Sequence, residues 1–115
     1  MFLEGDGVFV ERSDNILIQG NVIEYGETNI EFSFVNNSAV IGNFMRNPLG
    51  PFPRGQHFQA WNGNFNLTVS HNYVNSSADG ILPADQEDAI NFGVTTLINV
   101  SHNYIVGGKS PVICN

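Results

Sequence analysis

The sequence predicts an all-β chain wound as a parallel β-solenoid of about four coils. Three observations support this fold class. The composition is poor in the strong helix formers and rich in Val, Ile, Phe and Thr, which favour strands. Short apolar runs alternate with polar residues, and turn residues bound each run. An eight-residue pattern also recurs four times, with Asn at the same position in every copy.

The repeated pattern sets the spacing of the coils. Its copies are ILIQGNVI (16–23), SAVIGNFM (38–45), LTVSHNYV (67–74) and INVSHNYI (98–105). The shared residues Asn21, Asn43, Asn72 and Asn103 are separated by 22, 29 and 31 residues. Stacked at about 4.8 Å, their amides can bond one another and the peptide groups of the turn, so we expect an asparagine ladder. The flanking apolar residues should point inward: Ile16, Ile18, Ile23, Val40, Met45, Val69, Val74, Val100 and Ile105.

The residue before each ladder asparagine predicts a tight turn. This column holds Gly20, Gly42, His71 and His102. Glycine adopts positive φ freely, and histidine is one of the few other residues enriched there. The two imidazoles should stack about 5 Å apart. They could hold a metal, but no third ligand is evident and the turn alone explains them.

A second set of apolar runs precedes the repeats. It comprises GVFVER (7–12), IEFSF (30–34), HFQAW (57–61) and AINFG (89–93). Each coil therefore offers at least two strands, and residues 1–115 form a single solenoid segment. A new coil begins near residue 107 and no capping helix is visible, so we expect a piece truncated at one or both ends. Its uncapped coils would offer edges for end-to-end self-association.

Charge and composition exclude several classes of protein. The chain has 4 Lys and Arg against 11 Asp and Glu, a net charge of −7. Such a balance argues against nucleic-acid binding and against a polybasic membrane-surface protein. No apolar run is long enough for a transmembrane helix, and no signal peptide is visible at Met1. Cys114 is the one cysteine, so an internal disulfide is impossible, and a small buried side chain is its expected role.

The four-fold rung, of the type xIxVxxNxI, resembles the right-handed parallel β-helix proteins of the pectate-lyase-like superfamily and covers nearly the whole chain. That resemblance implies a right-handed parallel β-helix and an extracellular or cell-surface location. It also implies a secreted, carbohydrate-active segment that binds or cleaves a polysaccharide, as a polysaccharide lyase or a glycoside hydrolase. The same fold hosts many unrelated functions, so catalysis stays open. The alternative is a non-catalytic structural solenoid, such as an adhesin stalk or a tailspike-like scaffold.

Two long loops, 46–57 and 75–88, lead into the same strand column and should stack on one corner. We expect this corner to gather Arg54, Gln56, His57, Asp85, Glu87 and Asp88, with Glu27 one coil earlier. In a lyase or hydrolase, Arg54 and His57 would bind a uronate or act as the base, and Glu87 and Asp88 would bind Ca²⁺ or act as acid/base groups. The catalytic candidates are therefore Arg54, His57, Glu87 and Asp88.

Binding residues complete the expected site. Gln56, Trp61 and Glu27 are the substrate-binding candidates, and Asp85 is the candidate metal ligand. Because the chain carries −7, it would repel acidic sugars unless Ca²⁺ bridges them, so either Ca²⁺ takes part or the substrate is neutral. A structural interpretation competes with this one. In it, Arg54 pairs with Asp88 or Glu87 to tie two loops together, and Trp61 is a core or loop-packing residue.

Overall fold

The computed structural model describes residues 5–51, 53–76 and 87–114, and all regular elements in these ranges are β-strands. The strands are β1 (Val8–Asp14), β2 (Leu17–Gln19), β3 (Val22–Glu24), β4 (Ile30–Ile41), β5 (Phe44–Arg46), β6 (Phe58–Trp61), β7 (Asn64–Ser70), β8 (Tyr73–Asn75), β9 (Ile90–Phe92), β10 (Thr95–Ser101), β11 (Tyr104–Val106) and β12 (Val112–Cys114). Within these ranges there is no helix that could cross a membrane.

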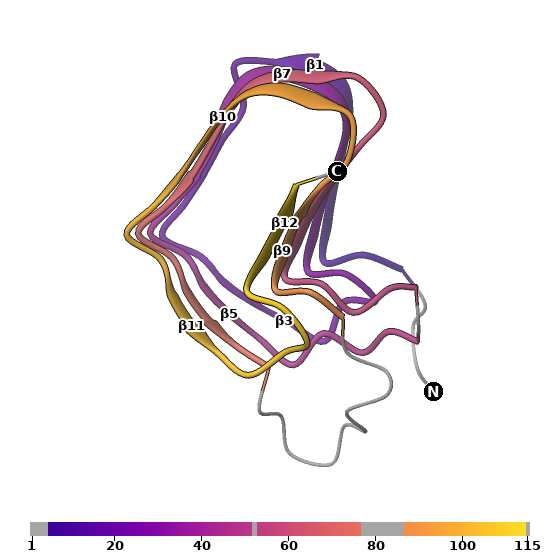
Figure 1. Cartoon of the computed structure of the whole chain (residues 1–115), viewed down its shortest axis with the longest axis vertical. Helices are drawn as coiled ribbons and strands as arrows, with labels where there is room; N and C mark the ends of the chain where they lie inside the picture. Colours follow the sequence, from indigo (N-terminus) through magenta and orange to yellow (C-terminus); the bar gives the residue numbers. More distant parts are fainter. Residues whose placement is uncertain (1–4, 52, 77–86, 115) are drawn as a thin grey trace.

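The strands form two parallel sheets (Figure 1). Sheet A follows the order β10-β7-β4-β6-β9-β12, with β1 and β2 also paired to β4. Sheet B follows the order β11-β8-β5-β3. Equivalent residues of successive repeats lie opposite one another, as Ile30 does with Phe58 and Phe58 with Ile90. The parallel stacking of both predicted sets of runs is therefore confirmed.

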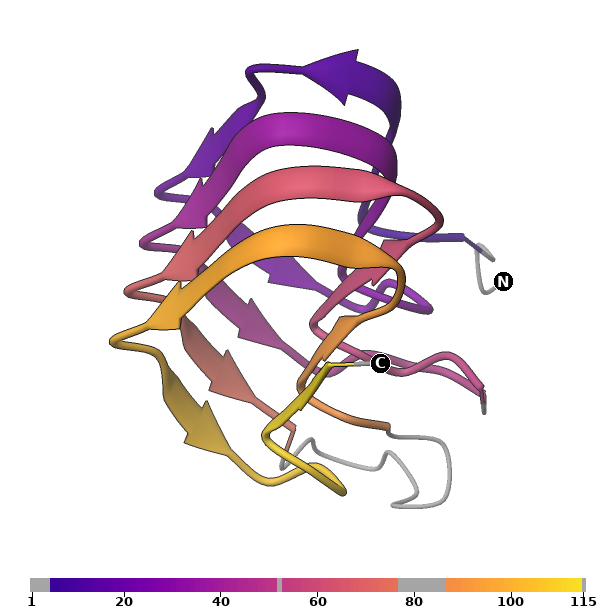
Figure 2. The ribbon, with the colours of Figure 1, turned by 45° about the horizontal axis from the view of Figure 1, so that its top comes forward.

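Strand β4 joins the two limbs of sheet A. Its first part pairs with β1 and β6, and its second part pairs with β1, β2 and β7. Phe34, between the two parts, has a φ of +56°, which bends a strand that would otherwise run straight. Sheet A is consequently a strongly curved half-barrel (Figure 2).

The expectation of a right-handed parallel β-helix of about four coils is wrong, because the described residues form this parallel half-barrel and no closed solenoid. We expected each coil to offer at least two short strands joined by turns. In the second repeat, β4 instead runs through both of the expected strands as one long strand. The described residues between β5 and β6 form no strand, and they include Pro48, Pro51 and Pro53. Proline has no N–H to give to a neighbouring strand, so this stretch is not a regular strand, although the N–H groups of Leu49 and Gly50 donate to the carbonyls of Gly26 and Glu27.

The core fills the concave side of the sheets. Phe32, Phe58 and Phe92 stack from β4 to β6 to β9, with ring centroids 5.2 and 5.5 Å apart. The predicted inward positions are confirmed. Buried side chains in the core are Ile18, Ile23, Val40, Met45, Val69 and Val74, and partly buried ones packed on it are Ile16, Val100 and Ile105.

The asparagine ladder is present and hydrogen-bonded throughout. The backbone N–H groups of Asn21, Asn43 and Asn72 each donate to the Oδ1 of the next ladder asparagine, at 3.0, 2.9 and 3.0 Å. Their Nδ2 groups donate to the same oxygens at 3.2, 3.1 and 3.0 Å. The preceding column has positive φ in all four repeats, between 56° and 68°, as predicted.

Cys114 departs from its expected role. It ends β12 and is exposed, so the prediction of a buried side chain is wrong. Within the described residues β12 pairs with β9 alone, so the end of this edge strand lacks cover on its other side.

Candidate functional site

The outer face of β4, β6 and β9 carries a polar column made of Glu31, Gln59 and Asn91. The strand register places these three residues opposite one another. Their neighbours Phe32 and Phe58 point into the core, so alternation along the strands directs the polar column to the opposite face. All three polar residues are nevertheless at least nine-tenths buried. This face is the candidate site.

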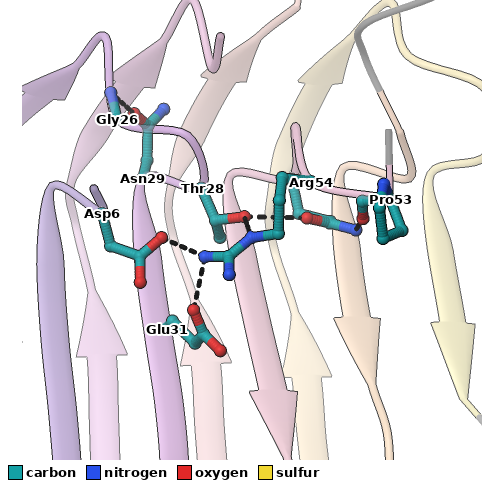
Figure 3. A network of polar contacts seen from close by, with 8 residues as sticks. Asp6, Gly26, Thr28, Asn29, Glu31, Pro53 and Arg54 are labelled. Atoms are coloured by element: carbon teal, nitrogen blue, oxygen red, sulfur yellow. Dashed lines mark hydrogen bonds and ion pairs between the residues drawn. The ribbon is translucent and has the colours of Figure 1, made fainter. Parts of the chain in front are cut away.

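Arg54 reaches the polar column from the segment before β6 (Figure 3). Its Nη2 donates to the carboxylates of Asp6 and Glu31. Its Nε donates to Thr28 Oγ1 at 3.1 Å. The sequence analysis placed Arg54 near Asp88 or Glu87, but the side chain extends back toward earlier repeats. Asp6 and Glu31 are thus members of the site that the sequence analysis missed.

Glu31 has an unusual protonation equilibrium. Burial, together with the nearby Asp6, raises the pKa of this carboxyl to about 7 against the opposing effect of Arg54. One guanidinium is shared by two acidic groups at this point. The charge of Arg54 is therefore already neutralised within the protein.

Gln56 lies beneath Arg54 and is fully engaged. Its Oε1 accepts a hydrogen bond from Thr28 Oγ1 at 2.8 Å, and its Nε2 donates to the Pro53 carbonyl at 2.8 Å. The side chain is 2% exposed. Gln56 fixes the segment that carries Arg54. Its amide oxygen already accepts a hydrogen bond within the protein and is not offered to a substrate.

His57 is completely buried behind the strands and lies within a hydrogen-bonded network. Asn29 Nδ2 lies 3.2 Å from Nδ1, and Ser76 Oγ lies 2.8 Å from Nε2. Asn29 Oδ1 accepts from the Gly26 N–H, so the amide orientation is set and Nδ1 must be the acceptor. Nε2 then carries the proton and donates to Ser76. Burial lowers the pKa of His57 to about 3, so its imidazole is neutral and has a structural role.

The remaining acidic candidates lie farther along the same corner. The Glu87 N–H donates to the Gly55 carbonyl, which confirms that the two loops meet there. Glu87 pairs with Lys109 at 3.4 Å, and Asp88 accepts from Asn91 Nδ2 at 3.2 Å. Glu27 is half-buried, and its backbone bonds to Gly5 and Gly50. Asp85 lies outside the described residues.

Trp61 is on the outer face, two residues along β6 from Gln59. It is 42% exposed, so it is available to a ligand and is not a core residue. Its ring packs beside Gly93, where a Cβ would come within 3.4 Å of Trp61 Cε3. The tightest contact of such a Cβ would be with the Ala60 carbonyl oxygen at 3.0 Å, so glycine at 93 leaves room for the β6 backbone beside the indole.

Two side-chain oxygens of the polar column have no hydrogen-bond donor among the described residues. They are Gln59 Oε1 and Asn91 Oδ1, and both are buried. Leaving a buried acceptor without a donor costs about 1–3 kcal/mol, so such atoms are uncommon in folded proteins. Their presence on adjacent strands of one face distinguishes this face from the rest of the described chain.

Two other features of the described residues are weaker candidates for a functional site. His71 and His102 stack with centroids 4.8 Å apart, as expected, but the described residues contain no group of three His, Cys, Asp or Glu side chains that could hold a metal. An open pocket of about 520 Å³ lies against β1, β2 and β3, and Val8, Ile18 and Ile23 are among its lining residues. None of the predicted site residues lines it.

Comparison of the chain with protein-family models, with curated proteins and with solved structures found no match. The resemblance to pectate-lyase-like proteins thus remains an expectation from the sequence.

Proposed function

We propose that this chain binds a polysaccharide without cleaving it, on the outer face formed by β4, β6 and β9. The observation that carries the proposal is the pair of buried, donor-free oxygens of Gln59 and Asn91. A sugar hydroxyl can donate to such an oxygen once the side chains that cover it move aside, because both atoms are buried in the free protein. Trp61 adds an exposed aromatic ring on the same face, and binding sites commonly combine apolar rings with a few placed polar groups.

Binding without cleavage follows from how the catalytic candidates are engaged. Arg54 is paired with two carboxylates, and His57 is neutral and bonded at both ring nitrogens. Glu87 and Asp88 have partners of their own. A lyase needs a base at the acidic carbon and positive charge at the carboxylate, and neither group is available in this arrangement.

A structural scaffold is the second candidate function. It is favoured by Arg54, which ties the segment before β1 to β4 and to the segment before β6. A scaffold requires these contacts between segments, but it does not require the unpaired oxygens. The two functions therefore differ in what they require of Gln59 and Asn91.

Affinity electrophoresis in gels containing neutral polysaccharides tests the proposal. We expect the protein to be retarded, and we expect Trp61→Ala to weaken binding by about tenfold or more, as loss of a central aromatic contact does. Gln59→Met should weaken binding while raising the free energy of unfolding by about 1 kcal/mol, because it removes a buried acceptor that lacks a donor. Phe65→Ala is the matched control, since Phe65 is an equally exposed aromatic residue on β7.

Two outcomes would contradict the proposal. If no polysaccharide retards the parent protein, the scaffold is the better account. If absorbance of an unsaturated product or new reducing ends appears with any polymer, the protein cleaves its ligand.

A further inference from the structure

We infer that the polysaccharide bound at this face is electrically neutral and carries no uronate carboxylates. This inference rests on the proposed function and names the chemical class of its ligand. Three independent features of the described residues lead to it: the pairing of the cations, the sign of the charges around the polar column, and the kind of polar atom left unpaired.

Every cationic side chain except histidine contacts a carboxylate. The chain has four Lys and Arg residues. Arg12 contacts Glu11, Arg46 contacts Glu24, Lys109 contacts Glu87, and Arg54 contacts two acids. A uronate needs a guanidinium, an ammonium or a bound Ca²⁺ to offset its charge. The described residues contain no group of three His, Cys, Asp or Glu side chains that could hold a metal, so the cation at the candidate site is Arg54, and the protein itself already provides its counter-charges.

The charges around the polar column are predominantly negative. Asp6 and Glu31 share Arg54, and Asp88 lies beside Asn91 at the other end of the column. An additional carboxylate would lie close to these groups in a region largely shielded from water. Like charges at such distances repel more strongly than they do in bulk solvent. A neutral sugar avoids this repulsion.

The unpaired atoms themselves select for hydroxyl groups. Gln59 Oε1 and Asn91 Oδ1 are acceptors, so the ligand must present a donor. A hydroxyl donates, whereas an ionised carboxylate can only accept. An acidic sugar that placed its carboxylate here would leave both protein oxygens unsatisfied and would bury its own charge without a partner.

A matched pair of polymers tests the inference. Polygalacturonate and the same polymer after reduction of its carboxyl groups to primary alcohols differ at one carbon of each sugar. We expect the reduced polymer, or another neutral polysaccharide, to retard the protein and polygalacturonate to leave its mobility unchanged. Stronger binding to polygalacturonate would overturn the inference while the proposed function stands. Retardation by neither charged nor neutral polymers would overturn the proposed function, and the inference with it.

A gain-of-binding variant addresses Arg54 directly. Asp6→Asn with Glu31→Gln removes both counter-charges of Arg54 and should raise the affinity for polygalacturonate by several-fold or more. Asp14→Asn with Glu27→Gln makes the same change in net charge at carboxylates that pair with no cation among the described residues, and it serves as the control. An equal gain in both double variants would show that net charge alone, and not the release of Arg54, governs binding, and would contradict the inference.

The salt dependence of the parent protein gives a second measurement that needs no variant. If repulsion excludes the acidic polymer, raising ionic strength screens the charges and should increase any weak retardation by polygalacturonate. Retardation that disappears with salt would indicate attraction between the protein and the polyanion, and it would overturn the inference.

Discussion

At the residue scale, the ladder asparagines form hydrogen bonds with the peptide groups of a turn, where no neighbouring strand supplies partners. Asn72 accepts from Asn43 through Oδ1, and its Nδ2 donates to the Val40 carbonyl at 2.9 Å and to Asn103. One buried side chain thus connects three successive repeats. Leucine has a similar branched shape but cannot make any of these bonds.

We expect Asn72→Leu to lower the free energy of unfolding by about 1–3 kcal/mol, because it leaves buried turn groups unpaired. Urea unfolding followed by circular dichroism measures the change. Asn99→Leu is the control, since Asn99 is exposed on β10 and a surface change of this kind costs less than about 0.5 kcal/mol. Equal stability of the Asn72 variant and the parent would show that the ladder adds nothing to the fold.

At the scale of elements, Arg54 connects three segments that are distant in the sequence. It joins the residues before β1 to β4 through Asp6 and Glu31, and its own segment precedes β6. Because burial raises the pKa of Glu31 to about 7, the folded protein retains a proton that the unfolded chain releases near pH 4.5. The stability that this proton confers is complete below pH 4.5 and is lost as the pH rises through 7.

The variant Glu31→Gln should abolish this pH dependence and leave Arg54 paired with Asp6. We expect the stability of the variant relative to the parent to increase between pH 4.5 and 7, by up to about 3 kcal/mol. Urea unfolding at several pH values measures it. The pKa of His57 is lowered to about 3, so this residue destabilises both proteins as the pH falls below 6.5. Because the effect is the same in parent and variant, it cancels when their free energies of unfolding are subtracted.

Ser33→Ala, two positions along β4, provides the control for this comparison. It alters no ionisable group, so its stability difference from the parent should not vary with pH. A pH-independent difference for Glu31→Gln as well would mean that Glu31 is ionised in the folded protein throughout the range.

At the scale of the whole molecule, β4 holds the half-barrel together. It pairs with β1, β2, β6 and β7, whereas β12 and β3 each have one partner strand. In hydrogen exchange, we expect the amides of β4 to be the slowest in the chain and those of β12 to be among the fastest, because edge strands open more readily. Protection of β12 equal to that of β4 would contradict this account of the sheet.

The sequence predicts the periodic features of the molecule better than its overall shape. Asn21, Asn43, Asn72 and Asn103 share a position in every repeat, so their stacking can be deduced from the pattern. The half-barrel cannot be deduced this way, because the merging of two faces depends on the bend at Phe34 inside one long strand. Periodicity gives no sign of such a bend.

The candidate site was predicted in part. The meeting of the two loops followed from their shared strand column, but Arg54 extends toward earlier repeats, and no local pattern links it to Asp6 and Glu31. The outer face of a strand is ordinarily exposed, so sequence alternation also gives no reason to expect that Gln59 is 1% exposed. These properties arise from side-chain direction and from cover by distant segments.

The hydrogen bonds between ladder asparagines have a direction, since each rung donates to the asparagine of the next repeat and accepts from that of the previous one. A duplication or deletion within the gene keeps this polarity only if it adds or removes a complete repeat unit. A partial unit would bring a different side chain to the rung and interrupt the stack. The protein can therefore change its length in evolution by whole repeats, while the segments between rungs, which already differ in length, are free to vary residue by residue.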